Sequence, residues 1–147
     1  MKISSLLGGL AGACALTLLH ETVRRQNKYA PRMDKLGMEA LAKGLKKSDQ
    51  KVPPEKELFY WTMAGDILSN ALYYSIAGLG KQKGVLSRSI ALGIAGGLGG
   101  MLLPKPLGLN EKPSNRTTQT KLMTVGWYLF GGLVAGSIMK ALNNKSE

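Results

Sequence analysis

The 147-residue chain has a single cysteine, Cys14, and a single histidine, His20. One cysteine cannot form an internal disulfide, which excludes a small extracellular domain held together by disulfides. The sequence also lacks a spaced cluster of metal ligands, a glycine-rich phosphate loop after a strand, and a nucleophile elbow. We therefore expect no metal, no cofactor and no enzymatic activity.

Charge is nearly absent from four stretches, although 20% of all residues are charged. The mean hydropathy of −0.03 hides this segregation because the charges concentrate between the stretches. A helix rises about 1.5 Å per residue and a bilayer core is about 30 Å thick, so these stretches fit membrane spans. The sequence predicts an all-α polytopic membrane bundle, one membrane domain over residues 1–147. The four expected spans cover residues 3–20, 58–80, 86–103 and 122–140.

The sequence supports the span 122–140 more strongly than the span 86–103. The stretch 122–140 has no charge before Lys140 and carries Trp127 and Tyr128 near one end, where aromatic rings favour the headgroup level. The stretch 86–103 is short and contains Arg88. Either the Arg88 side chain extends to the interface, or this segment enters and leaves the membrane on one side.

The first apolar stretch also has the pattern of a signal peptide. Lys2 precedes a short apolar region, and Ala11-Gly12-Ala13 offers a small-residue cleavage site. Against cleavage, the apolar run continues through Leu16 and Leu19. We expect this stretch to be a retained membrane span.

Lysine and arginine set the expected orientation, since they remain in cytoplasmic loops. With four spans, the segments 20–57 and 104–121 lie on one side and hold 10 and 4 of the 20 basic residues, while the other side holds 6. This asymmetry predicts both termini outside and the loop 21–57 in the cytoplasm, in a bacterial inner membrane. If the third segment does not cross, the C-terminus moves to the other face.

The loop 21–57 contains an expected amphipathic helix over residues 32–47, with Pro31 at its start. Its apolar and small side chains share one face, and its charged side chains lie opposite. The first group is Met33, Leu36, Gly37, Ala40, Leu41, Gly44 and Leu45, and the second is Arg32, Lys35, Glu39, Lys43 and Lys46. Such a helix either lies in the interface beside anionic lipids or packs against the bundle or a partner's helix.

Glycines four residues apart are the next strong pattern. Small residues at this spacing let membrane helices approach closely, and we expect a tightly packed bundle. The pairs are Gly8 and Gly12, Gly93 and Gly97, Gly96 and Gly100, and Gly132 and Gly136. The pattern leaves open whether these faces meet within one chain or between copies in a homo-oligomer.

An acid inside the second apolar stretch is the most unusual residue of the sequence. Helical spacing places four polar side chains beside Asp66, which makes an intramembrane polar stripe. The stripe consists of Thr62, Asp66, Ser69, Asn70 and Tyr73. Three interpretations remain open: hydrogen bonds between helices, a proton or ion path, and catalysis.

A charged cluster follows the first span. His20, Glu21, Arg24 and Arg25 are expected to anchor and cap that helix, because cations favour a helix C-terminus. A grouping with Asp66 is conceivable, since both helix ends reach one surface. However, adjacent residues on a helix point about 100° apart, which disfavours shared metal ligation by His20 and Glu21.

The net charge of +11 raises nucleic acid as a partner. The positive-inside pattern explains this charge, and the sequence has no aromatic and basic reading surface, so we expect anionic lipid headgroups and no nucleic acid. The favoured function is a small non-enzymatic accessory or structural membrane subunit. It would pack through its glycine faces and use its basic loop to contact lipid or a membrane partner. The alternative is a small oligomeric channel or proton-coupled transporter that uses Asp66 and Asn70.

Overall fold

The computed structural model describes residues 2–144, which are 78% helical with no strand in this range. The prediction of an all-helical chain is confirmed. The α-helices are α1 (Ile3–Val23), α2 (Met33–Lys47), α3 (Glu55–Ser75), α4 (Val85–Leu102), α5 (Lys112–Asn115) and α6 (Thr118–Asn144). Two short 3₁₀ turns, Ile76–Gly78 and Gln82–Gly84, connect α3 to α4.

Three helical segments are long and apolar enough to cross a membrane. They are Ile3–Val23, Gln82–Leu102 and Thr118–Asn144. This is compatible with a helical membrane bundle and indicates a membrane-embedded protein. The helix α3 is not among them, because even the part that follows its charged first turn contains polar residues, above all Asp66 and Asn70.

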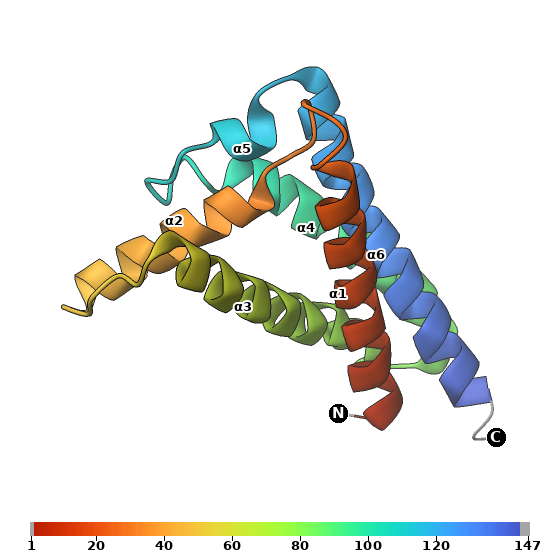
Figure 1. Cartoon of the computed structure of the whole chain (residues 1–147). Helices are drawn as coiled ribbons and strands as arrows, with labels where there is room; N and C mark the ends of the chain where they lie inside the picture. The colour runs from red at the N-terminus through yellow and green to blue at the C-terminus, as the bar shows by residue number, and fades with distance from the viewer. Residues whose placement is uncertain (1, 145–147) are drawn as a thin grey trace.

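The helices pack in the order α3, α1, α6, α4, with α6 between α1 and α4 (Figure 1). Gly8 of α1 faces Met139 near the end of α6, which makes α1 and α6 antiparallel. Gly93 of α4 faces Leu129 of α6 and Gly97 faces Val125, so α4 is also antiparallel to α6. It follows that α1 and α4 run in the same direction.

Because α1 and α4 are parallel, the chain has to return between them, and α3 makes this return. Near the start of α3, the Phe59 ring lies under the Arg24 guanidinium, 5.6 Å from its carbon, just beyond the end of α1. At the other end of α3, Ser75 donates a hydrogen bond to the Ser5 carbonyl at the start of α1. The first and last described residues therefore lie at the same end of the bundle (Figure 1).

The second apolar stretch, expected to be helical over 58–80, differs from the structure at both ends. The helix begins earlier, at Glu55, and its α-helical part ends at Ser75. A 3₁₀ turn follows, Leu79 is extended, and Gly80 then adopts φ 106°, a left-handed conformation that favours glycine. The apolar run therefore continues through a turn rather than through one straight helix.

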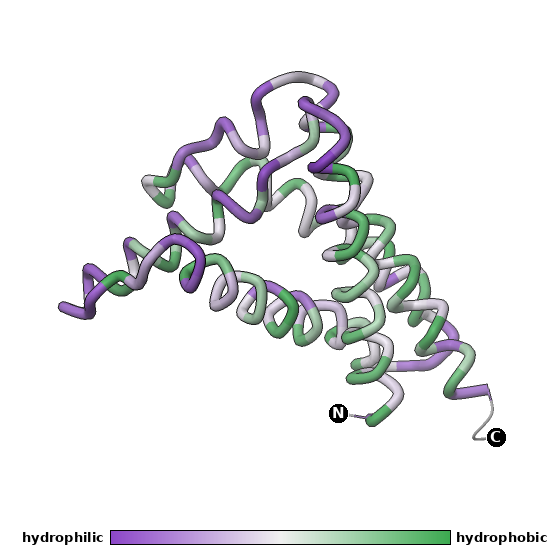
Figure 2. Tube along the Cα trace, in the orientation of Figure 1, coloured by the Kyte–Doolittle hydropathy of each residue, from purple (hydrophilic) through white to green (hydrophobic). Residues whose placement is uncertain are grey.

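Hydrophilic residues gather in the connections around α2 and α5, whereas hydrophobic residues follow α1 and α6 (Figure 2). We call the connection 24–32, α2 and the segment 103–117 the basic end of the molecule. The turn at 81–84 lies at the opposite end, where Gln82 and Lys83 share a surface hollow with Lys140 of α6. The charge asymmetry of the sequence therefore corresponds to two ends of the folded chain.

The buried apolar core is small, and large apolar side chains cover much of the outer surface. The core cluster comprises Leu16, Ala30, Tyr74, Ala77, Val85, Trp127, Ala135 and Met139. The exposed side chains include Leu18, Trp61, Leu68, Leu98, Leu122 and Phe130, which come from α1, α3, α4 and α6. Apolar surface spread over four helices fits contact with lipid chains rather than with water.

Candidate functional site

The glycines on α1, α4 and α6 lie where helices come closest. A Cβ added to Gly93 would stand 2.8 Å from the Leu129 Cα, and one added to Gly97 would stand 2.6 Å from the Val125 Cα. Gly12 and Gly132 face backbone atoms of a neighbouring helix in the same way, and Gly8 and Gly136 face neighbouring backbone or side-chain atoms at close range. These faces meet within one chain.

Gly96 and Gly100 have different surroundings, although they share the same spacing. Cβ atoms there would meet side chains rather than a helix backbone: the rings of Tyr128 and Tyr73 at Gly96, and the Met33 methyl group at Gly100. This second row of α4 glycines therefore borders a recess instead of a helix contact.

Three consecutive residues at the end of α3 connect it to three different helices. The Tyr73 hydroxyl donates to the Leu92 carbonyl of α4 at 2.8 Å, and the Tyr74 hydroxyl donates to the Tyr128 carbonyl of α6 at 2.7 Å. Ser75 donates to the Ser5 carbonyl of α1 at 3.0 Å. The polar stripe expected on α3 thus includes a helix cross-link at Tyr73, whereas the cross-links made by Tyr74 and Ser75 were not predicted.

The remaining stripe residues do not form one continuous line. Asn70 donates to the Asp66 carboxylate at 3.2 Å, whereas the exposed Ser69 hydroxyl bonds to the Asp66 carbonyl of its own helix. The Thr62 hydroxyl is buried beside Gly37 and has no hydrogen-bond partner within residues 2–144. Only Asp66 and Asn70 pair through their side chains.

Asp66 lines a small, partly open pocket between α1, α2, α3 and α6, with room for about one water molecule. Its polar lining residues are Thr17, His20, Asp66, Thr124 and Tyr128. The Thr17 side chain is 8% exposed, and its hydroxyl has no hydrogen-bond partner in the described chain. A carboxylate and an unpaired hydroxyl therefore face the same water-sized space, and the sequence did not single out Thr17 because it lies inside an apolar run.

The charged cluster at the end of α1 is a network that extends to α2. Glu21 accepts two hydrogen bonds from Arg24, at 2.7 and 2.6 Å, and Arg25 lies 3.5 Å from the same carboxylate. Asp34 of α2 accepts two more from Arg32, at 2.9 and 2.6 Å. These paired bonds hold each carboxylate in a fixed orientation.

Asp34 is the centre of this network. Its side chain is 2% exposed and lies 3.8 Å from both Arg24 and His20. Burial alone would raise the pKa of the Asp34 carboxyl, but the Arg32 hydrogen bonds and the nearby charges hold this pKa below its usual value. The His20 Nε2 is 3.0 Å from the Pro31 carbonyl, and its ring lies 5.4 Å from that of Trp127.

The grouping of His20, Glu21 and Asp66 considered from the sequence is only partly present. His20 and Asp66 line the same pocket, while Glu21 pairs with arginines away from it. Within residues 2–144, no group of three or more His, Cys, Asp or Glu side chains is arranged to hold a metal ion. The structure brings Asp34, not Asp66, into the cluster of charges.

The helix α2 packs on the bundle through one edge of its apolar face. Leu36 is 8% exposed, and a Cβ on Gly37 would stand 2.6 Å from the Thr62 methyl group. On the other edge, Glu39 pairs with Lys43 at 2.8 Å and accepts a hydrogen bond from the Asn110 amide at 3.0 Å. The structure therefore holds α2 between α3 and the segment 103–117, while other α2 side chains stay exposed. These are Lys35, Ala40, Lys43, Lys46 and Lys47.

No family model matches the chain, and no similar protein was found among curated sequences or solved structures.

Proposed function

We propose that the protein is a small, non-enzymatic membrane protein that acts as an accessory subunit, and that its basic end contacts anionic lipid headgroups. The observation that carries this proposal is the position of α2, whose apolar edge is held against the bundle while Lys35, Lys46 and Lys47 remain exposed. Exposed cations beside a membrane attract anionic lipids, by about 1 kcal/mol each. In this proposal the chain crosses the membrane four times, since α3 crosses in addition to the three long apolar helices. Both termini then lie on the side opposite the basic end.

The interior of the molecule is consistent with a structural role. The glycine faces of α1 and α6, and the Gly93 and Gly97 face of α4, are occupied by neighbouring helices of the same chain. The hydroxyls of Tyr73, Tyr74 and Ser75 are used in hydrogen bonds between helices. Groups that are engaged in this way stabilise one arrangement of helices, and the exposed lysines of the basic end are available for contacts with lipid headgroups.

Neutralising the three exposed lysines tests this function. We expect the Lys35→Gln, Lys46→Gln and Lys47→Gln variant to bind anionic lipid about 100-fold more weakly, since each cation contributes about 1 kcal/mol. The measurement is the enrichment of phosphatidylglycerol over phosphatidylcholine around the full-length protein in mixed nanodiscs. Lys81→Gln with Lys83→Gln, at the opposite end, is the control and should keep the enrichment. An equal loss of phosphatidylglycerol enrichment in the triple variant and in the control would contradict the proposal.

A second candidate is a proton-coupled transporter, because the Asp66 carboxylate and the unpaired Thr17 hydroxyl face one water-sized pocket. An acid inside a membrane bundle often belongs to a proton or ion route. This candidate predicts that Asp66→Asn abolishes proton flux into liposomes, while the elution volume of the purified protein stays unchanged. Ser69→Ala, on the exposed side of α3, should leave the flux intact. Undiminished flux in Asp66→Asn would eliminate this candidate.

A further inference from the structure

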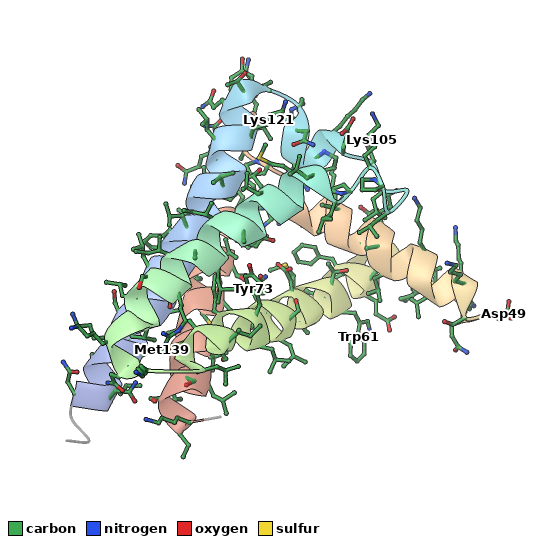
Figure 3. All side chains as sticks on the ribbon, turned by 180° about the vertical axis from the view of Figure 1, so that it is seen from behind. Asp49, Trp61, Tyr73, Lys105, Lys121 and Met139 are labelled. Carbon is green, nitrogen blue, oxygen red and sulfur yellow. The ribbon has the colours of Figure 1, made fainter. Side chains whose placement is uncertain are left out.

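An apolar groove lies between α3 and α4, beneath α2. It has a volume of about 420 Å³, within the roughly 300–1,000 Å³ of typical small-molecule sites. Its lining includes Leu36, Tyr73, Gly96, Gly99, Leu103 and Leu107. Figure 3 shows Tyr73 close to the point where α3 and α4 approach each other, with the two helices diverging toward α2.

The groove stays open because α4 presents only glycines and the small Ala95 side chain along this side. A Cβ added to Gly99 would meet only the Leu103 Cδ1, at 3.5 Å, which is ordinary contact. At Gly96, a Cβ would meet the rings of Tyr128 and Tyr73, and Tyr73 itself lines the groove. The Tyr73 hydroxyl donates to the Leu92 carbonyl of α4 at 2.8 Å, which ties α3 to α4 at this lining residue. The two helices that border the groove are therefore connected beside it.

Charged residues lie outside the groove, on the segment beside α2. All the residues that line the groove are uncharged. The exposed Lys105 follows the lining residue Pro104 directly and lies on the segment beside α2 (Figure 3). Lys43 is engaged there with Glu39 and with the Gly108 carbonyl. The backbone of an exposed cation therefore adjoins the apolar groove at the basic end.

We propose that this groove binds one acyl chain of an anionic phospholipid, with the lipid phosphate beside Lys105. A bilayer lipid has the matching arrangement: a long apolar chain in the membrane core and a negative group at the surface. The inference rests on the proposed function only in placing the basic end at an anionic membrane surface. It adds a single defined lipid site to the general attraction exerted by the lysines of α2.

The test is native mass spectrometry of the delipidated full chain, titrated with dipalmitoyl phosphatidylglycerol or with dipalmitoyl phosphatidylcholine. These lipids share their acyl chains and differ in headgroup charge. We expect one phosphatidylglycerol per chain, bound about fivefold more tightly than phosphatidylcholine, as one lysine contributes about this factor. Lys105→Gln should retain one lipid but lose the preference for phosphatidylglycerol.

Filling the groove should remove both lipids. We expect Gly99→Phe to weaken binding of each lipid at least tenfold, while Gly126→Phe, which has open space around it, binds like the original chain. If Gly99→Phe fails to fold, Ala95→Phe replaces it as the test variant. Ala95 also lines the groove, and we expect the same loss of binding. Unchanged binding in folded Gly99→Phe or Ala95→Phe would overturn the proposal. The proposal would also be overturned if the lipid-free protein were a dimer and either variant made it monomeric, because a second copy of the chain would then occupy the groove.

The same titration separates this site from the proposed function. The variant with Lys35, Lys46 and Lys47 changed to glutamine should still retain one tightly bound lipid, even though its general enrichment of anionic lipid falls. If that enrichment does not fall but Gly99→Phe loses its lipid, the proposed function fails and the lipid site stands. If enrichment falls while Gly99→Phe keeps its lipid, the site fails and the function stands.

Discussion

Asp34→Asn is expected to lower the free energy of unfolding by about 3 kcal/mol, because breaking one side of a buried ion network leaves its partners uncompensated. The Asp34 side chain is 2% exposed, accepts two hydrogen bonds from Arg32 and lies 3.8 Å from Arg24. An amide in its place keeps the shape but removes the charge that pairs with Arg32, whereas Arg24 keeps its two hydrogen bonds to Glu21. Thermal unfolding of the purified protein in mild detergent, followed by tryptophan fluorescence, measures the change.

The control is Asp49→Asn, at an exposed position after α2. Asparagine tolerates the φ of 54° found there, so this variant should unfold like the original chain. The pH dependence gives a second check. Because the pKa of Asp34 is lowered in the folded chain, its contribution is complete above the unfolded value of about 3.9 and is lost as the pH falls through the folded pKa. Equal stability of the two variants would contradict the central role of Asp34.

Gly97→Leu is expected to destabilise the protein by at least about 3 kcal/mol, at the upper end of the cost of overpacking. The cost is high because a Cβ on Gly97 would stand 2.6 Å from the Val125 Cα, and a backbone atom cannot turn aside as a side chain can. The helices α4 and α6 have to separate along their length to admit the new side chain. Denaturant titration in detergent, together with the elution volume, measures the loss.

Gly126→Leu provides the matched comparison on α6. A Cβ at Gly126 meets no atom within 4 Å, so the same substitution adds a side chain without displacing a helix. Leucine also favours the helical conformation over glycine by about 1 kcal/mol, so stability should stay level or rise. If Gly97→Leu were as stable as Gly126→Leu, the close approach of α4 and α6 would be refuted.

Much of the fold could be predicted from the distribution of charge. Runs without charge predict helices long enough for a membrane, and three such helices are present. The boundaries of α3 could not be read in this way. Its first turn carries Glu55 and Lys56, which hydropathy assigns to a loop. Its α-helical part ends at Ser75, inside the apolar run, where a 3₁₀ turn and the extended Leu79 follow.

The candidate site was less accessible to sequence reasoning. Glu21 and Arg24 are three residues apart on one helix, so their pairing follows from helical spacing. Asp34 belongs to another helix and joins them only because the connection 24–32 folds back, which no local pattern reports. Thr17 is equally hidden, since a threonine in an apolar run becomes notable only when the pocket it shares with Asp66 is known.

The most direct measurement is the side of the membrane on which the two ends of α3 are exposed. In a chain with Cys14 replaced by alanine, Ser48→Cys would be labelled by a membrane-impermeant maleimide at the basic end, and Lys81→Cys at the opposite end. A return of the chain through α3 predicts labelling of Ser48→Cys only in inverted vesicles and of Lys81→Cys only in right-side-out vesicles. Labelling of both positions from the same side would contradict the crossing of α3 and the position of the basic end that the proposed function requires.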